Sequence, residues 1–72
     1  RLAISNVNVP GMLGQMTAIL AERNINVIDL INKSRDDLAY NLIDLSAAPD
    51  EGLLQAIREI ESVIDVRVIK GA

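Results

Sequence analysis

Cysteine and histidine are absent from the 72 residues of this chain, and Tyr40 is its only aromatic residue. Without thiols and imidazoles there is no cysteine nucleophile, no histidine acid–base catalyst and none of the usual zinc ligands. The acidic pairs at residues 36–37 and 50–51 supply too few converging oxygens for a hard metal ion. The net charge is −3, whereas nucleic-acid binding requires a basic surface and usually stacking aromatics. The composition therefore predicts no catalytic residues, no metal site and no nucleic-acid partner.

Long apolar runs are missing as well. No stretch reaches the length of a membrane span and no signal peptide is visible, so we expect no membrane partner. The absent cysteines fit a reducing compartment, and we expect a cytoplasmic protein. Half of the residues are nevertheless hydrophobic, which suffices for the core of one small domain. The length predicts that residues 1–72 are a single domain, and because the chain opens at Arg1 rather than Met, we expect it to be a fragment of a longer protein.

Apolar spacing changes five times along the chain and divides it into six elements. Alternating apolar residues predict four strands, at residues 2–7, 25–34, 38–46 and 63–70. Helical spacing predicts one helix from Met12 to about Arg23 and another that starts near Pro49. The order β-α-β-β-α-β is that of the ferredoxin-like fold. We therefore expect an α+β sandwich in which two helices cover one face of a four-stranded antiparallel sheet.

The edges of this sheet are expected to differ in their tendency to associate. The second and fourth strands lie at the edges, and both faces of the strands carry apolar side chains although helices cover only one face. The fourth strand carries Asp65, Arg67 and Lys70, charges that discourage pairing, whereas the second has only Asp29 and Lys33. Exposed apolar surface of this kind usually has a partner. The pattern predicts a homodimer joined through the edge of the second strand.

The junction between the first strand and the first helix is the candidate binding site. Asn6 and Asn8 stand at alternate positions ahead of Pro10 and Gly11. Pro10 keeps the strand extended, and Gly11, which has no Cβ, lets a ligand or another backbone approach closely. The helix that starts at Met12 leaves its first N–H groups without intrahelical partners, and these suit a small carboxylate. The pattern predicts a site for a small zwitterion.

Each candidate also has an interpretation without a ligand. Asn6 and Asn8 are typical of turns, where the side-chain amide bonds to nearby backbone. Gly11 serves a tight strand-to-helix turn whether or not a ligand binds there. Asn26, close after a helix end, suits a cap or a loop. The residue types alone leave both interpretations open.

A resemblance to a known family sharpens these expectations. The run Asn8-Val9-Pro10-Gly11-Met12-Leu13-Gly14, followed by Ala21-Glu22-Arg23-Asn24-Ile25-Asn26-Val27, resembles the ACT domain, a regulatory module that senses amino acids. Residues 32–35 and 39–44 look most like the C-terminal ACT domain of D-3-phosphoglycerate dehydrogenase. The resemblance covers essentially the whole chain. It implies an NAD-dependent parent oxidoreductase of serine biosynthesis that L-serine inhibits in many organisms, with no cofactor in this domain itself.

The resemblance also implies where the ligand binds. In the serine-sensing members the ligand lies between two domains, so Asn6 and Asn8 of one chain would face Asn26 of the other. The best-known serine-inhibited members have an imidazole where this chain has Asn6, and an asparagine can still accept from an ammonium or donate to a carboxylate. The residues expected to bind a small L-amino acid, with L-serine as the first choice, are Asn6, Asn8, Pro10, Gly11, Met12, Leu13, Asn26, Val27 and Ile28.

Other classes of function remain open at this point. A structural dimerisation domain of the same enzyme, without an effector, fits the apolar surface equally well, and an ACT domain of another enzyme of amino-acid metabolism is a further alternative. Catalysis by the chain itself is disfavoured. A ferredoxin-like acylphosphatase would need an arginine in the first loop, and a ferredoxin-like metal carrier a Cys-x-x-Cys motif there. This loop instead reads Val7-Asn8-Val9-Pro10-Gly11.

Overall fold

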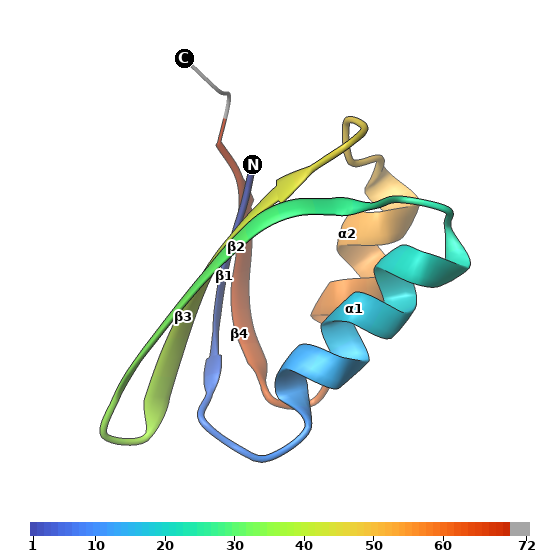
Figure 1. Cartoon of the computed structure of the whole chain (residues 1–72). Helices are drawn as coiled ribbons and strands as arrows, with labels where there is room; N and C mark the ends of the chain where they lie inside the picture. Colours follow the sequence, from blue (N-terminus) through green and yellow to red (C-terminus); the bar gives the residue numbers. More distant parts are fainter. Residues whose placement is uncertain (70–72) are drawn as a thin grey trace.

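The computed structural model describes residues 1–69 and contains the six expected elements in the expected order. These elements are β1 Leu2–Val7, α1 Met12–Glu22, β2 Val27–Arg35, β3 Leu38–Leu45, α2 Glu51–Arg58 and β4 Val63–Val68. Neighbouring strands are antiparallel in the order β2-β3-β1-β4, and both helices lie on the same face of the sheet (Figure 1). The α+β ferredoxin-like fold is therefore confirmed. Lys70, expected at the end of the last strand, lies outside the described residues.

The hydrophobic core fills the space between the helices and the sheet. Alternate residues of the two central strands point toward the helices, as period-two alternation requires. The buried residues that form the core are Leu2, Ile4, Met12, Met16, Leu20, Ile43, Leu53, Leu54, Ile57 and Val66. The two methionines therefore belong to the core. Asp50 caps α2, because its carboxylate accepts from the backbone N–H of Leu53 at 2.7 Å.

Helix α1 begins without a side-chain cap. Its N-cap residue is Gly11, which adopts a left-handed conformation with φ of 84°. A Cβ built on Gly11 would meet no heavy atom within 4 Å, so no other part of the chain approaches it closely. The positive φ, rather than close packing, is what requires glycine at this turn. Two residues at other turns also have positive φ, 58° at Asn24 after α1 and 55° at Asp36 in the β2–β3 hairpin.

Strand β2 contains an irregularity that the sequence pattern does not reveal. Its register against β3 shifts between Val27 and Asp29, where two residues of β2 oppose one of β3. Side chains beyond the shift change face, so Leu30 packs against the core and Ile31 lies on the opposite face of the sheet. At the shift itself, Ile28 is 69% exposed, more than any other large hydrophobic residue among those described. The edge strand therefore presents apolar side chains to solvent.

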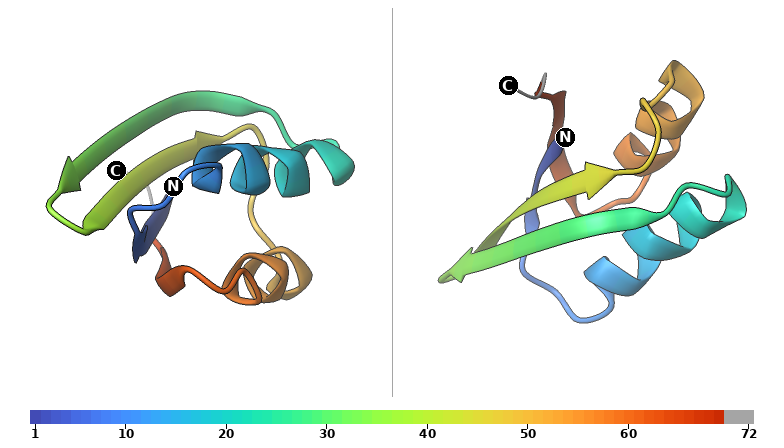
Figure 2. Two further views of the ribbon diagram at one scale, coloured as in Figure 1. Left: turned by 90° about the horizontal axis from the view of Figure 1, so that it is seen from below. Right: turned by 45° about the horizontal axis from the view of Figure 1, so that its top comes forward.

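Within residues 1–69, no helix covers the face of the sheet away from α1 and α2 (Figure 2). Tyr40 lies exposed on this face, close to Ser5 of the neighbouring strand. Arg1 donates from Nε to a carboxylate oxygen of Asp44 at 2.8 Å on the same face. This hydrogen bond lowers the pKa of Asp44 and raises that of Arg1. Neither described helix is long and apolar enough to cross a membrane.

Two glycines at the start of α1 provide a matched test of this geometry. A Cβ on either Gly11 or Gly14 would meet no heavy atom within 4 Å, but only Gly11 has a positive φ. We expect Gly11→Ala to lower the free energy of unfolding by about 1–2 kcal/mol, the cost of a left-handed alanine. Gly14→Ala should raise it by about 0.5–1 kcal/mol, because alanine favours a helix. Urea denaturation of both variants measures the difference, and equal effects would contradict the turn described here.

Candidate functional site

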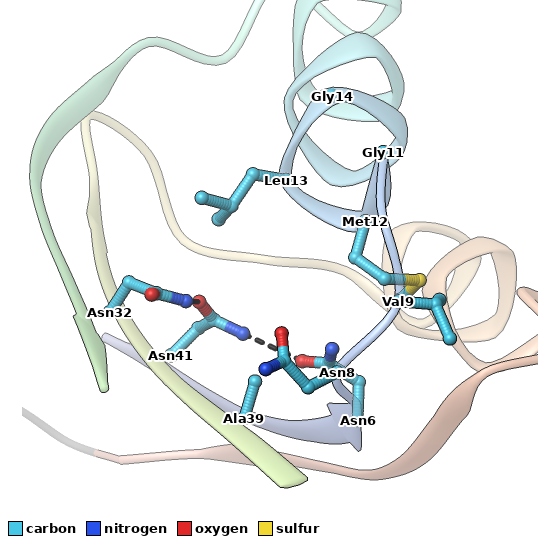
Figure 3. Close-up of a pocket in the computed structure, with 10 residues that line it drawn as sticks. All are labelled: Asn6, Asn8, Val9, Gly11, Met12, Leu13, Gly14, Asn32, Ala39 and Asn41. Atoms are coloured by element: carbon cyan, nitrogen blue, oxygen red, sulfur yellow. Dashed lines mark hydrogen bonds between the residues drawn. The ribbon is translucent and has the colours of Figure 1, made fainter. Parts of the chain in front are cut away.

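A hollow of about 260 Å³ opens between the first turn of α1 and the helix-facing side of the sheet (Figure 3). The first turn of α1 forms one wall, and side chains of β1, β2 and β3 form the other. The residues that line it are Asn6, Asn8, Val9, Gly11, Met12, Leu13, Gly14, Asn32, Ala39 and Asn41. None of these residues is charged at neutral pH. The hollow is thus polar through amides and backbone groups rather than through ionised side chains.

Backbone hydrogen bonds hold the loop between β1 and α1 in place. The N–H of Asn8 donates to the carbonyl of Asp37 at 2.7 Å, which joins this loop to the β2–β3 hairpin turn. The N–H of Val7 donates to the carbonyl of Ser62 at 2.8 Å, which joins it to the segment before β4. Three segments that are distant in sequence therefore meet at one end of the hollow. The arrangement fixes the entry of the chain into α1.

The start of α1 faces the hollow with free donors. The first helical hydrogen bond runs from the N–H of Gln15 to the carbonyl of Gly11 at 3.0 Å. The N–H groups of Met12, Leu13 and Gly14 come before it, and no side chain caps them. Together with the positive end of the helix dipole, these groups suit a carboxylate. A ligand with a small anionic group fits this wall.

Buried asparagines form the opposite wall. Asn6 and Asn41 are each 1% exposed and are the only polar residues in the core of the described residues. The side-chain N–H of Asn41 donates to Oδ1 of Asn6 at 2.7 Å, and that of Asn6 donates to the carbonyl of Val7 at 2.9 Å. Asn32, on β2, donates in turn to Oδ1 of Asn41. Figure 3 shows the three amides in a row across the strands.

The structure brings together part of the predicted site. Asn6, Asn8, Gly11, Met12 and Leu13 line the hollow, whereas Pro10 lies in the same turn but outside the lining. Asn6 is more than a simple turn residue, because its buried amide accepts from Asn41 of β3 as well as donating to the neighbouring backbone carbonyl of Val7.

Three other predicted residues lie elsewhere in this chain. Asn26, Val27 and Ile28 are at the opposite end of β2 and do not line the hollow. The backbone of Asn26 forms two hydrogen bonds with Ser46. The N–H of Asn26 donates to the Ser46 hydroxyl at 3.0 Å, and the carbonyl of Asn26 accepts from the N–H of Ser46 at 2.9 Å. This fits the loop interpretation of Asn26. The contribution of these residues to a partner's site stays a prediction.

Sequence reasoning missed Asn32 and Asn41 as site residues. A signal for Asn41 was present, since Ala39, Asn41 and Ile43 share one face of β3 and the asparagine interrupts an apolar series. For Asn32 the register shift in β2 hid the face on which it lies. Asn32 pairs directly with Asn41 only in the folded sheet. Within residues 1–69 no group of three or more acidic, histidine or cysteine residues is placed to hold a metal ion.

Comparison with known proteins identifies the family. The model of the ACT domain family matches residues 1–65, and the chain belongs to this family. ACT domains are generally regulatory domains that bind small molecules, typically amino acids, and they commonly dimerise. No curated protein matches the chain.

Solved structures share the fold at low sequence identity. The crystal structure of the ACT domain from GTP pyrophosphokinase of Chlorobium tepidum is 20% identical with a TM-score of 0.70, over 92% of this chain and 90% of that one. Protein BT0572 from Bacteroides thetaiotaomicron is 19% identical with a TM-score of 0.66, over 88% of this chain and 43% of that one. The quorum-quenching acylase GqqA is 21% identical with a TM-score of 0.62, over 90% of this chain and 39% of that one. The chain thus spans less than half of these last two proteins, and the likenesses show the fold alone.

Proposed function

We propose that this chain is a regulatory domain that binds a small L-amino acid, with L-serine as the first candidate, in the hollow beside α1. The observation that carries the proposal is the pairing of free helix N–H groups on one wall with uncharged amides on the other. This combination matches a zwitterion with a small neutral side chain. The volume of about 260 Å³ lies just below the range of about 300–1,000 Å³ for sites of drug-sized ligands. A small ligand is therefore the better fit.

The chemistry of binding follows from the two walls. The ligand carboxylate accepts from the N–H groups near Met12 and Leu13, while Asn8 and the partner's Asn26 reach the ammonium or the side chain. Hydrogen bonds to charged groups contribute roughly 1.5–3 kcal/mol each. L-Serine has about seven heavy atoms, so micromolar binding at about −8 kcal/mol stays below the ceiling of about −1.5 kcal/mol per atom. No charged side chain is needed for such an affinity.

The partner's Asn26 reaches the hollow only if two chains join through β2. Antiparallel pairing of the β2 edges about a two-fold axis makes a self-complementary contact and a continuous eight-stranded sheet. A pairing centred on Asp29 places the partner's Asn26 opposite Asn32, and one centred on Leu30 places it opposite Ser34. Both positions lie at the end of β2 where the hollow opens. The exposed apolar edge at Ile28 supports this mode of association.

Calorimetric titration with the twenty common amino acids tests ligand binding directly. We expect heat of binding for a small neutral amino acid, and we expect Asn8→Ala and Asn26→Ala each to abolish most of it. Gln55→Ala is the matched control, because Gln55 is an exposed amide on α2 that does not line the hollow. If neither asparagine variant alters the heat, the ligand binds at another place.

Sedimentation tests the dimer. Ile28→Pro should weaken association, since proline cannot donate to a ladder of hydrogen bonds, whereas Ile64→Pro on the other edge strand should not. Ile64 is 58% exposed and lies beside the register shift between β1 and β4, so the two variants are closely matched. Ile28→Lys provides a second variant in case proline disturbs the fold. A wild-type monomer at high micromolar concentration would argue strongly against the dimer.

The parent protein is, in this proposal, an NAD-dependent D-3-phosphoglycerate dehydrogenase whose catalytic domain the chain regulates. A ligand that bridges two domains favours one relative orientation, and typical couplings of about 1–3 kcal/mol change an equilibrium about 5- to 150-fold. L-Serine should then lower the turnover of the full-length enzyme, and deletion of residues 1–72 should remove that sensitivity. A truncated enzyme that serine still inhibits would place the effector site in another domain.

A structural dimerisation domain without an effector is the second candidate. One observation favours it: every buried side-chain nitrogen and oxygen of the described residues already has a partner within the chain. The two buried amides of the hollow, Asn6 and Asn41, are therefore satisfied without a ligand. A stable dimer that binds none of the twenty amino acids would support this candidate over the first.

A further inference from the structure

Three asparagines beside α1 form a directional series that we name the amide chain: Asn32, Asn41 and Asn6. Each amide donates to the next, and the last donates to the backbone carbonyl of Val7. The amide chain crosses β2, β3 and β1 on the side that faces the helices (Figure 3). It is the only polar row on that side among the described residues, because the other buried residues of these strands are apolar.

The carbonyl of Val7 fixes the direction of the whole amide chain. A backbone carbonyl can only accept, so the NH₂ group of Asn6 must face it. The oxygen of Asn6 is then turned toward Asn41, which must present its own NH₂ group. The same logic turns the oxygen of Asn41 toward the NH₂ group of Asn32. Reversing any one amide would set two acceptors or two donors against each other.

This direction leaves the oxygen of Asn32 at the open end. Asn32 is exposed at the mouth of the hollow, and within residues 1–69 its Oδ1 has no donor. Asn6 and Asn41, in contrast, are fully buried. The row of hydrogen bonds therefore starts at the backbone carbonyl of Val7 and ends at the hollow with Oδ1 of Asn32. The row fixes the direction in which this acceptor points. An acceptor in this position selects a ligand that brings a donor.

We infer that Asn32 binds the α-ammonium of the ligand through Oδ1, and that Asn41 and Asn6 are positioning residues that hold this oxygen toward the hollow. The inference rests on the proposed function, since it assumes an amino acid whose carboxylate lies at the start of α1. It assigns the ammonium to a residue of the same chain and leaves Asn8 and the partner's Asn26 to the side chain. No residue that lines the hollow is an acid that could pair with the ammonium, so the ammonium depends on neutral acceptors such as Oδ1 of Asn32.

Stability alone gives a weak reason for the amide chain. Burying amides at the helix-facing side of a sheet costs desolvation, which their mutual hydrogen bonds offset only in part. Ala39 and Ile43, which flank Asn41 on the same face of β3, are apolar and buried. Apolar residues would satisfy packing at these positions without any need for partners. A role in orienting an acceptor explains why three amides occur together.

The test compares two ligands that differ in the ammonium. L-Serine carries it, and 3-hydroxypropionate keeps the carboxylate and the hydroxyl but lacks it. We expect Asn32→Ala to weaken L-serine at least about tenfold, as loss of a hydrogen bond to a charged group does, and to change 3-hydroxypropionate less than about twofold. Gln55→Ala, at an exposed amide on α2 outside the lining, should change neither affinity. Calorimetry and titration by NMR provide the affinities.

A second variant tests the positioning role. Asn41→Leu removes the acceptor that orients Asn32 and fits a buried site. The side-chain ¹H–¹⁵N signals of Asn32 should shift, and the preference for L-serine over 3-hydroxypropionate should fall as in Asn32→Ala. Circular dichroism checks that the variant is folded, and Asn6→Leu serves in its place if it is not.

The possible outcomes separate this inference from the proposed function. If wild-type protein binds L-serine but Asn32→Ala binds it equally well, or weakens both ligands equally, the ammonium assignment is overturned and the regulatory role stands. If another amino acid binds in place of L-serine, that acid and its deaminated counterpart are the probes. If wild-type protein binds none of the twenty amino acids, both proposals are wrong.

Discussion

The packing of both helices against one face of the sheet is the constraint on which the rest of this structure depends. It buries the inward residues of β1 and β3 and brings the first turn of α1 over the sheet. Near that turn the buried row changes from apolar residues to Asn6 and Asn41. The hollow lies where the buried row ends in these amides. In the described part of the chain, the same packing leaves the opposite face of the sheet without a helix.

The two walls of the hollow have different physical origins. One consists of backbone N–H groups that every helix start leaves free, and a left-handed glycine directs them without adding a side chain. The other consists of side chains whose orientation is set by hydrogen bonds between strands. A backbone wall is expected in any domain with this turn. The amide wall depends on the side chains at three particular positions, and it is where the identity of a ligand would be decided.

The comparisons with known proteins likewise separate the fold, which is shared, from the side chains that would select a ligand. The ACT domain of GTP pyrophosphokinase shares the fold at 20% identity, so the arrangement of strands and helices is kept although most residues differ. Membership of the ACT family follows from the match over residues 1–65 and establishes a regulatory class of domain. The identity of the ligand depends on a few side chains in the hollow, and a likeness in fold does not determine which side chains these are.

The sequence by itself determined the order of the elements and the turn at Gly11, because these depend on local spacing and backbone preference. The edge and central strands followed from that order only through the ferredoxin-like fold to which it belongs. The sequence also indicated the β1–α1 junction as a site, since free N–H groups follow from any helix start. Only the tertiary structure decided that Asn32 and Asn41 join Asn6. Their contact depends on the register between β2 and β3, and a shift near Asp29 that no local pattern reveals sets the face on which Asn32 lies. Pairing between strands is a long-range property, and the amide wall exists only through it.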